Sequence, residues 1–186
     1  MKLRTGTSGF SYVPWKGPFY PEDLPNKQML SYYASKLPTV EINNTFYRMP
    51  KPELLASWAR EVPPEFSFAL KASQQITHRK RLKECKEPVE YFFRTAGELG
   101  AQLGPTLFQL PPNLKKDVPR LVEFLQLLPP ERRCAFEFRH ETWFCDETWE
   151  ALRAGKAALC VAEAEDLATP LVATADWGYL RLRRQD

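Results

Sequence analysis

The sequence predicts an α/β fold, namely a TIM-type (β/α) barrel that lacks the last strand–helix unit of a complete eightfold barrel. Three observations favour this fold. Strand-like segments alternate with amphipathic segments, no linker or change of composition divides the chain, and side chains alternate in character within the strands. The chain has 186 residues, whereas a complete barrel has roughly 250. We expect one domain over residues 1–186.

Seven segments are predicted to be strands because they are short, rich in β-branched or aromatic residues, and bordered by turn formers. In order, they are residues 5–8, 39–43, 66–72, 106–110, 134–139, 157–162 and 178–183. The first strand leads into a tight polar turn, Gly6-Thr7-Ser8-Gly9, and not into the glycine pattern GxGxxG of nucleotide-binding folds.

Five segments carry apolar residues at helical spacing and are predicted to be helices. They cover residues 27–37, 52–62, 88–99, 118–128 and 146–154, with no helix expected between the last two strands. Asp117 and Asp146 are expected N-caps, and Gly155 is expected to end the last helix. This succession predicts parallel strands with right-handed crossovers. Such a sheet either closes into a barrel or stays open and doubly wound; the unbroken pattern favours the barrel.

Side chains two apart in a strand point to the same face, so each predicted strand divides into two sets. Val40 and Ile42 oppose Glu41 and Asn43. The same alternation sets Phe66, Phe68 and Leu70 against Ser67, Ala69 and Lys71; Phe108 and Leu110 against Leu107 and Gln109; Phe136 and Phe138 against Ala135, Glu137 and Arg139; and Leu180 and Leu182 against Tyr179 and Arg181. In a barrel the large apolar set packs against the outer helices. The polar residues of the other set then gather at the carboxyl ends of the strands, where barrel enzymes place their sites.

Charged residues on the predicted inner face need compensation, because a buried charge is costly unless it is paired. Glu41, Lys71, Glu137, Arg139 and Arg181 include both signs, so they can compensate one another. One interpretation is an ion-pair network that only holds the fold together. The other is a polar binding site, which the sequence favours because apolar side chains would fill a purely structural interior at lower cost.

The overall composition is that of a mildly basic protein, with net charge +3 and a pI of about 8.6. This is too small an excess to indicate nucleic-acid binding by itself. Residues 78–83 are locally basic and are expected to be either a solvated loop or an anion contact. No signal-like or membrane-length apolar segment is present, and the four cysteines show no CxxC pair. We therefore expect a cytoplasmic protein with free thiols.

Several short motifs occur in a fixed order along the chain. They are GTSGFSY at 6–12, VEINNTFY at 40–47, ALKA at 69–72 with ITH at 76–78, LFQLPP at 107–112, FEFRH at 136–140 with WF at 143–144, and AD at 175–176 before YLRL at 179–182. Together they resemble the YecE-like family, a domain of unknown function. The resemblance implies a TIM-barrel fold and supplies no reaction.

The family pattern usually continues beyond the seventh strand, where this chain soon ends. The resemblance therefore implies a fragment, a truncated product or a divergent open barrel. An open barrel would leave the first and last strands as unpaired edges, and such edges tend to associate with other chains. We therefore expect such a chain to form a homodimer, to be marginally stable, or to be an incomplete part of a longer sequence.

Five residues are the candidates for catalysis: Glu41, Glu137, Lys71, His78 and His140. The two glutamates lie on different strands at similar heights and are expected to act as a carboxylate pair, as in glycoside hydrolysis. Lys71 is expected to act as an electrophile or to hold an anion. A Schiff-base role would require a desolvated amine, and two flanking carboxylates would instead keep it charged. Each histidine follows a strand end, where a proton-transfer group would lie or where local hydrogen bonds would hold it. No cofactor and no metal site are predicted; a single divalent metal held by both glutamates and one histidine is an alternative with weak support.

A second set of residues is expected to bind the ligand: Asn43, Tyr47, Gln109, Arg139, Trp143, Asp176 and Arg181. Guanidinium groups suit phosphate or carboxylate, and aromatic rings suit sugars or nucleobases. The leading hypothesis is a hydrolase or isomerase that acts on a small polar or phosphorylated molecule. The alternatives are a nucleic-acid-binding or nuclease-like barrel and a non-catalytic structural or partner-binding barrel. No membrane partner is expected.

Overall fold

The computed structural model describes residues 3–163 and 167–182. The chain forms two compact units. The first unit combines the chain up to residue 71 with residues 93–104, and the second combines residues 72–92 with the chain from residue 105 onward. Helix α4 (Lys86–Ala96) contributes residues to both units.

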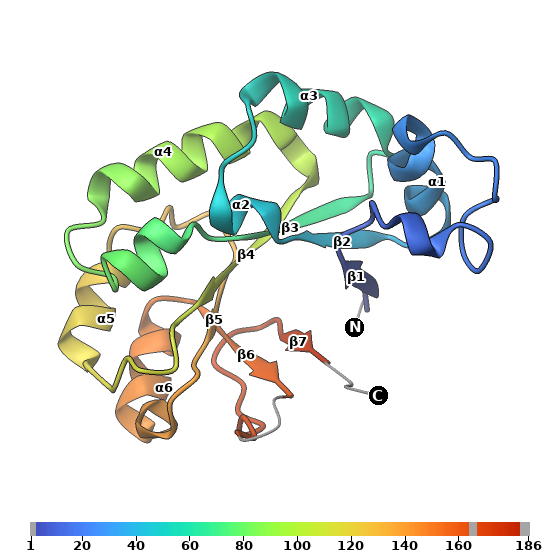
Figure 1. The fold of residues 1–186 in the computed structure, drawn as a ribbon. Coiled ribbons are helices and arrows are strands. Elements are labelled where there is room, and N and C mark those ends of the chain that lie inside the picture. Colours follow the sequence, from blue (N-terminus) through green and yellow to red (C-terminus); the bar gives the residue numbers. More distant parts are fainter. Residues whose placement is uncertain (1–2, 164–166, 183–186) are drawn as a thin grey trace. The chain divides into compact units, whose positions relative to one another are not determined.

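The first unit contains strands β1 (Gly6–Ser8), β2 (Thr39–Ile42) and β3 (Ser67–Lys71). Its helices are α1 (Met29–Lys36), α2 (Asn44–Tyr47) and α3 (Pro52–Glu61), with short 3₁₀ segments η1 (Val13–Trp15), η2 (Asn26–Gln28) and η4 (Gly97–Gln102). The strands are parallel, and α1 and α3 lie on one side of them (Figure 1). The predicted outward set is confirmed here, since Trp58 of α3 stacks on Phe68 of β3 with ring centroids 6.1 Å apart.

The second unit contains β4 (Leu103–Gln109), whose first two residues belong to the first unit, and strands β5 (Cys134–Glu137), β6 (Ala158–Ala162) and β7 (Tyr179–Arg181). Helices α5 (Val118–Leu125) and α6 (Asp146–Ala154) lie side by side, and η3 (Gln75–Arg79, a π-helix) and η5 (Glu141–Trp143) follow β3 and β5 (Figure 1). Phe108 stacks on Phe136 at 5.2 Å and meets Phe124 of α5 edge-on at 5.3 Å. On the other face, Leu107 and Ala135 pack in a small core with side chains of β6.

The predicted TIM-type barrel is wrong. The strand order is β1-β2-β3-β4-β5-β6-β7, and β1 and β7 are the two edges of the sheet among the described residues. The pairs β1–β2, β2–β3, β4–β5, β5–β6 and β6–β7 are parallel. The fold is therefore α/β with a TIM-like strand order in an unclosed sheet. Alternating strands and helices are equally compatible with an open and a closed sheet, because closure depends on pairing between the first and last strands.

The strand β7 also departs from the prediction on its apolar side. Leu180 and Leu182 were expected to pack beneath helices, but they are 59% and 76% exposed. The expected helix-free connection between β6 and β7 is confirmed for the described residues, so no helix of that connection covers these leucines. Residue Arg183, the predicted end of this strand, lies outside the described residues.

The helix ends test the expected caps. Asp117 caps α5 as predicted, because its Oδ1 accepts a hydrogen bond from the Arg120 backbone N–H at 3.1 Å. The prediction for Asp146 is wrong: Cys145 is the extended N-cap of α6, and Asp146 is the first helical residue. A carboxylate in the first turn also stabilises a helix, through the helix dipole. Asp146 therefore still marks the start of α6, one residue after the true N-cap. Gly155 ends α6, as predicted.

The observed strands reproduce the seven predicted segments with their ends shifted by at most three residues. Short elements were missed, notably α2 and the π-helix η3, because four- or five-residue helices carry too little periodicity to be recognised. No helix in the described ranges is long and apolar enough to cross a membrane.

Candidate functional site

The most deeply buried charge of the second unit is Glu137, at the carboxyl end of β5. Its side chain has 0% exposure. Arg139, two residues further on, donates from Nε and Nη2 to its Oε1, and Arg181 of β7 donates from Nη1 to its Oε2 at 2.6 Å. Both carboxylate oxygens thus accept charge-assisted hydrogen bonds, which are stronger than neutral ones. The predicted inner face therefore does bring Glu137, Arg139 and Arg181 together.

Gln109 lies beside this ion-pair cluster. It is the registered partner of Glu137 in the parallel pair β4–β5, so the two side chains are neighbours on one face. Its Oε1 is buried and has no hydrogen-bond partner among the residues that the structure describes. A buried polar atom without a partner lowers the stability of the fold by about 1–3 kcal/mol. A hydrogen-bond donor of a ligand would supply the missing partner.

Arg139 is the member of the cluster that solvent can reach. Its side chain is 17% exposed, against 6% for Arg181. The guanidinium is held by Glu137, and the side chain remains partly exposed. A guanidinium held in this way binds carboxylate or phosphate with little further loss of side-chain entropy.

The first unit has its own polar group at the carboxyl ends of its strands. Glu41 of β2 is 7% exposed, and its Oε1 accepts a hydrogen bond from Ser8 Oγ of β1 at 2.9 Å. Lys71, at the end of β3, places Nζ 4.3 Å from the centre of the Phe46 ring. A cation over an aromatic face is stabilised by the ring quadrupole. Glu41 and Lys71 therefore share the face on which the strand alternation placed them.

The residues after β2 form the exposed part of this group. Asn43 is half-buried, immediately precedes α2, and makes no side-chain capping bond. Tyr47 is 72% exposed, with its ring edge-on to Phe46 at 5.0 Å. Thr45 fixes the loop, because its Oγ1 donates to the carbonyls of Ile42 and Lys71 at 2.9 and 2.6 Å. An exposed ring on a fixed backbone is a surface on which a planar or sugar ring can stack.

Both histidines are engaged locally. His140 Nδ1 accepts from the Thr142 backbone N–H at 3.2 Å and lies 2.9 Å from Thr142 Oγ1, so it caps η5. His78 Nδ1 lies 2.9 Å from Thr77 Oγ1. These contacts orient each imidazole. Their catalytic roles stay predictions.

Two predicted ligand-binding residues are placed differently from the rest. Trp143 is 1% exposed, donates its indole N–H to the Leu114 carbonyl at 2.7 Å, and stacks on Phe138 at 4.7 Å. Trp143 therefore packs in the interior, between the segments that follow β4 and β5. Asp176 is exposed and precedes β7, so it lies at the opposite end of that strand from its carboxyl end.

The glutamate pair and the metal alternative stay predictions. Glu41 belongs to the first unit and Glu137 to the second. Within residues 3–163 and 167–182, no group of three or more His, Cys, Asp or Glu side chains is placed to hold a metal ion.

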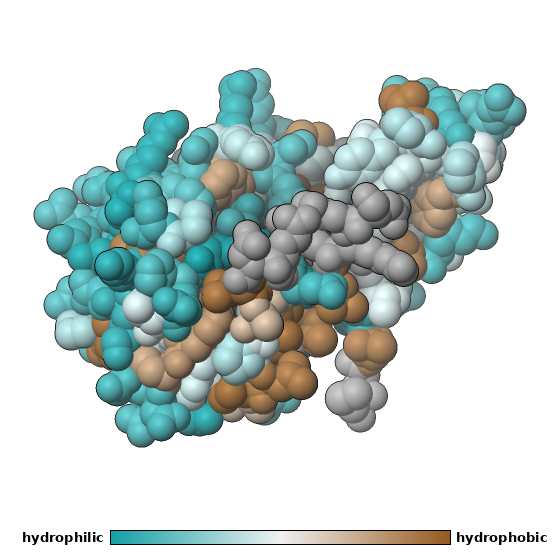
Figure 2. All heavy atoms as spheres, turned by 60° about the horizontal axis from the view of Figure 1, so that its bottom comes forward, coloured by the Kyte–Doolittle hydropathy of each residue, from teal (hydrophilic) through white to brown (hydrophobic). Residues whose placement is uncertain are grey.

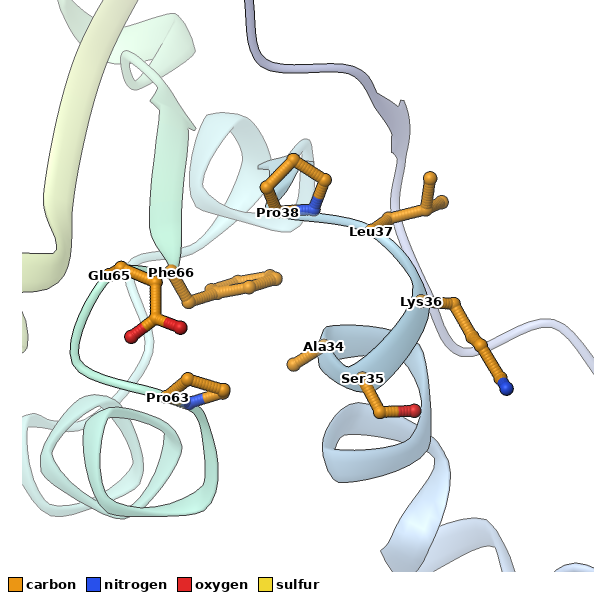
Figure 3. Close-up of a pocket in the computed structure, with 8 residues that line it drawn as sticks. All are labelled: Ala34, Ser35, Lys36, Leu37, Pro38, Pro63, Glu65 and Phe66. Atoms are coloured by element: carbon orange, nitrogen blue, oxygen red, sulfur yellow. The ribbon is translucent and has the colours of Figure 1, made fainter.

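A separate pocket of about 210 Å³ lies in the first unit, at the amino ends of β2 and β3 (Figure 3). Its lining comes from the end of α1 and from the loops that lead into these strands, and includes Lys36, Pro38, Glu65 and Phe66. None of the predicted site residues lines it. Sites in parallel α/β sheets lie at the carboxyl ends of the strands, so we do not take this pocket as the functional site.

Ser8 and Phe46 are parts of the polar group that the sequence did not single out as site residues. Ser8 was visible only as part of a tight polar turn. Its signal was its place at the carboxyl end of a strand; the structure shows that it is the register partner of Glu41 in the parallel pair β1–β2. Phe46 carried no signal, because a ring beneath Lys71 is recognisable only in three dimensions.

The fold and these groups define an α/β protein with a parallel sheet and buried charged side chains at the carboxyl ends of its strands. The family model described as "Protein of unknown function DUF72" matches residues 4–186. The chain belongs to this family. The YecE-like resemblance is thereby confirmed, since the curated relatives include a protein named YecE.

Two of these relatives are bacterial proteins. UPF0759 protein YecE of Escherichia coli K12 is 33% identical over 116 residues, which cover 62% of this chain and 43% of the relative. UPF0759 protein YunF of Bacillus subtilis 168 is 29% identical over 139 residues, which cover 70% of this chain and 49% of the relative. The chain thus matches less than half the length of each, and their names state no reaction.

Solved structures agree on the fold. A DUF72 family protein from Thermotoga maritima has a TM-score of 0.85 and 34% identity, covering 96% of this chain and 73% of that one. A DUF72 family protein from Enterococcus faecalis V583 has a TM-score of 0.75 with 19% identity, over 96% of this chain and 72% of that one. The second likeness concerns the fold alone.

Proposed function

We propose that this protein binds a small polar ligand at the carboxyl ends of β4 and β5, and that it is a hydrolase or isomerase. The observation that carries the proposal is the buried Oε1 of Gln109, which has no hydrogen-bond partner in residues 3–163 and 167–182 and lies beside the arginine-held Glu137. This oxygen accepts a hydrogen bond from a ligand hydroxyl or N–H group. Arg139 offers a fixed, partly exposed donor to an oxygen or an anionic group of the same molecule. A polyhydroxylated compound with an anionic substituent satisfies both.

The two glutamates are proposed to have different roles. Glu137 has both oxygens bonded to guanidinium groups, so it suits holding and orienting the arginines. Glu41 accepts from the uncharged Ser8 hydroxyl and is our candidate for proton transfer in the first unit. Lys71 beside Phe46 is proposed to stabilise negative charge there.

The test is ligand binding to the wild-type chain and to Gln109→Leu, measured by isothermal titration calorimetry with neutral sugars and sugar phosphates. Leucine is close to glutamine in size and removes the unpartnered amide. We expect Gln109→Leu to lose ligand affinity at least tenfold and to melt at a higher temperature than wild type, because a costly orphan atom is gone.

Gln126→Leu is the matched control, since Gln126 is an exposed residue at the end of α5. It should bind as wild type does. The proposal fails if no compound in the panel binds the wild-type chain, or if Gln109→Leu binds as tightly as wild type. A more stable variant without any change in binding would favour a purely structural role for the cluster.

A further inference from the structure

The segment that follows β3 in the second unit has an unusual backbone. It begins with the π-helix η3 (Gln75–Arg79) and continues through residues with left-handed backbone angles, Arg81 at φ 50°, Leu82 at φ 67° and Glu84 at φ 47°. None of these three is a glycine. Each such residue costs about 1–2 kcal/mol relative to an ordinary conformation. Single-turn π-helices and left-handed non-glycine residues both concentrate at functional sites.

Buried side chains hold this conformation in place. Leu82 is 3% exposed, and Ile76, Thr77 and Cys85 are all fully buried. The Leu82 backbone N–H donates to the Ile76 carbonyl at 3.0 Å, and Cys85 Sγ donates to the Lys83 carbonyl at 3.2 Å. The inward side chain of Leu82 thus acts as an anchor between outward-facing neighbours. Packing of these side chains maintains the left-handed backbone of Arg81, Leu82 and Glu84, at positions where glycine would have no backbone strain.

The anchored segment presents cations. Four of the five residues from 79 to 83, here called the basic loop, are Arg79, Lys80, Arg81 and Lys83. Within the part of the chain that the structure describes, none of the four forms an ion pair. Arg81 Nη2 donates to Asn113 Oδ1 at 3.3 Å, which ties the loop to the segment that follows β4. The carboxyl ends of neighbouring parallel strands are where ligands bind in α/β sheets.

We propose that the basic loop is a preformed binding site for the phosphate group of a small phosphorylated molecule, with Arg81 as its central donor. A guanidinium fixed by a neutral amide oxygen keeps its full charge and its remaining N–H groups for the ligand. The strained backbone fixes the cations before the ligand arrives, which reduces the entropy lost on binding. The proposal goes beyond the polar site at β4 and β5, because phosphate binding here requires neither Gln109 nor Glu137.

The first experiment titrates the full chain with inorganic phosphate, with glucose 6-phosphate and with glucose at about 0.15 M salt, using isothermal titration calorimetry. We expect saturable binding of both phosphate compounds, and we expect glucose not to displace inorganic phosphate from the loop. Arg81→Gln should weaken phosphate binding at least tenfold. Arg153→Gln removes the same charge from an exposed position on α6 and should leave binding unchanged.

A second variant separates a preformed site from a diffuse positive charge. Leu82→Ala keeps all four cations but loosens the anchor, so it should weaken phosphate binding severalfold at temperatures where circular dichroism shows it folded. Wild-type affinity in Leu82→Ala would overturn the preformed site. Binding that Arg81→Gln and Arg153→Gln weaken equally would overturn the role of Arg81.

Two further outcomes complete the test. Absence of saturable phosphate binding by the wild-type chain would overturn the proposal. So would tight binding of a 12-nucleotide single strand that glucose 6-phosphate does not displace, because that result assigns the cations to a nucleic-acid backbone. Gln109→Leu should leave inorganic phosphate binding unchanged, so this inference and the proposed function can fail independently.

Discussion

Glu137 and Arg181 form a buried ion pair across 44 positions of the chain, with Arg181 Nη1 2.6 Å from Glu137 Oε2. Their side chains are 0% and 6% exposed, respectively. Arg139 bonds to the other oxygen of the same carboxylate. The carboxylate therefore connects β5 to β7 and holds the one guanidinium of the cluster that solvent reaches.

Glu137→Gln should destabilise the protein by about 3–5 kcal/mol, because it leaves guanidinium groups buried without their carboxylate. The free energy of unfolding, measured by urea titration, checks this. Glu147→Gln is the control: it breaks the exposed ion pair with Lys116, 3.3 Å long, and removes a carboxylate from the first turn of α6, so it should cost no more than about 1 kcal/mol. Equal effects of the two variants would contradict the burial argument.

Lys156→Gly should stabilise the protein by about 1 kcal/mol. Lys156 has φ 52° just after α6, and its backbone N–H donates to the Arg153 carbonyl at 3.0 Å while Ala157 N–H donates to Leu152 at 2.9 Å. This is the hydrogen-bond pattern of a Schellman motif, whose left-handed residue is usually glycine.

Arg153→Gly, three residues earlier and inside the helix, should instead destabilise by about 1 kcal/mol. Thermal and urea unfolding of both variants measure the difference. The two variants should change the free energy of unfolding in opposite directions. A change in the same direction would mean that the left-handed backbone of Lys156 is not strained.

Alkaline conditions should destabilise the fold through its buried thiols. Burial raises the pKa of Cys134 from 9.0 to about 12. Between these values the unfolded chain loses a proton that the folded state keeps, so the free energy of unfolding present below pH 9 falls as the pH rises. The slope from this thiol is at most about 1.4 kcal/mol per pH unit.

Cys134→Ala should make the unfolding free energy less dependent on pH between 9 and 12, although it lowers stability at neutral pH. Cys145→Ala is the control because Cys145 is partly exposed. An unchanged slope in Cys134→Ala would show that other groups, such as Cys85, whose pKa burial raises to about 11, dominate the alkaline loss.

The exposed leucines beside β7 should promote self-association. Leu171, Leu180 and Leu182 are 88%, 59% and 76% exposed, and Figure 2 shows hydrophobic surface on the face that is turned forward from the bottom of Figure 1. Among the described residues β7 is the last strand of the sheet and pairs with β6, and edge strands tend to associate with other chains.

We expect light scattering to show concentration-dependent dimers for the wild-type chain and a shift toward monomer for Leu180→Lys. Leu54→Lys, at a residue 46% exposed on α3, makes the same change in the first unit and should have no effect. A wild-type chain that stays monomeric at high concentration would refute this expectation.

Local sequence determined much of this protein. The alternation of Glu41 with Val40 and Ile42, and of Glu137 with Phe136 and Phe138, assigned strand faces correctly, because successive side chains on a strand point to opposite sides. Helix positions followed from apolar residues at helical spacing, because side chains three and four apart lie on the same face of a helix. The Asp117 cap was readable because its partner is only three residues away.

The tertiary structure decided what depends on residues distant in sequence. The sheet is unclosed because β1 and β7 do not pair among the described residues, and pairing between terminal strands is not encoded in either strand alone. The sequence supplied Glu137, Arg139 and Arg181 as candidates, but only folding determined which oxygen each guanidinium meets. The left-handed backbone of Arg81 and Leu82 likewise arises from packing that overrides local preference, since nothing in these residue types favours that conformation.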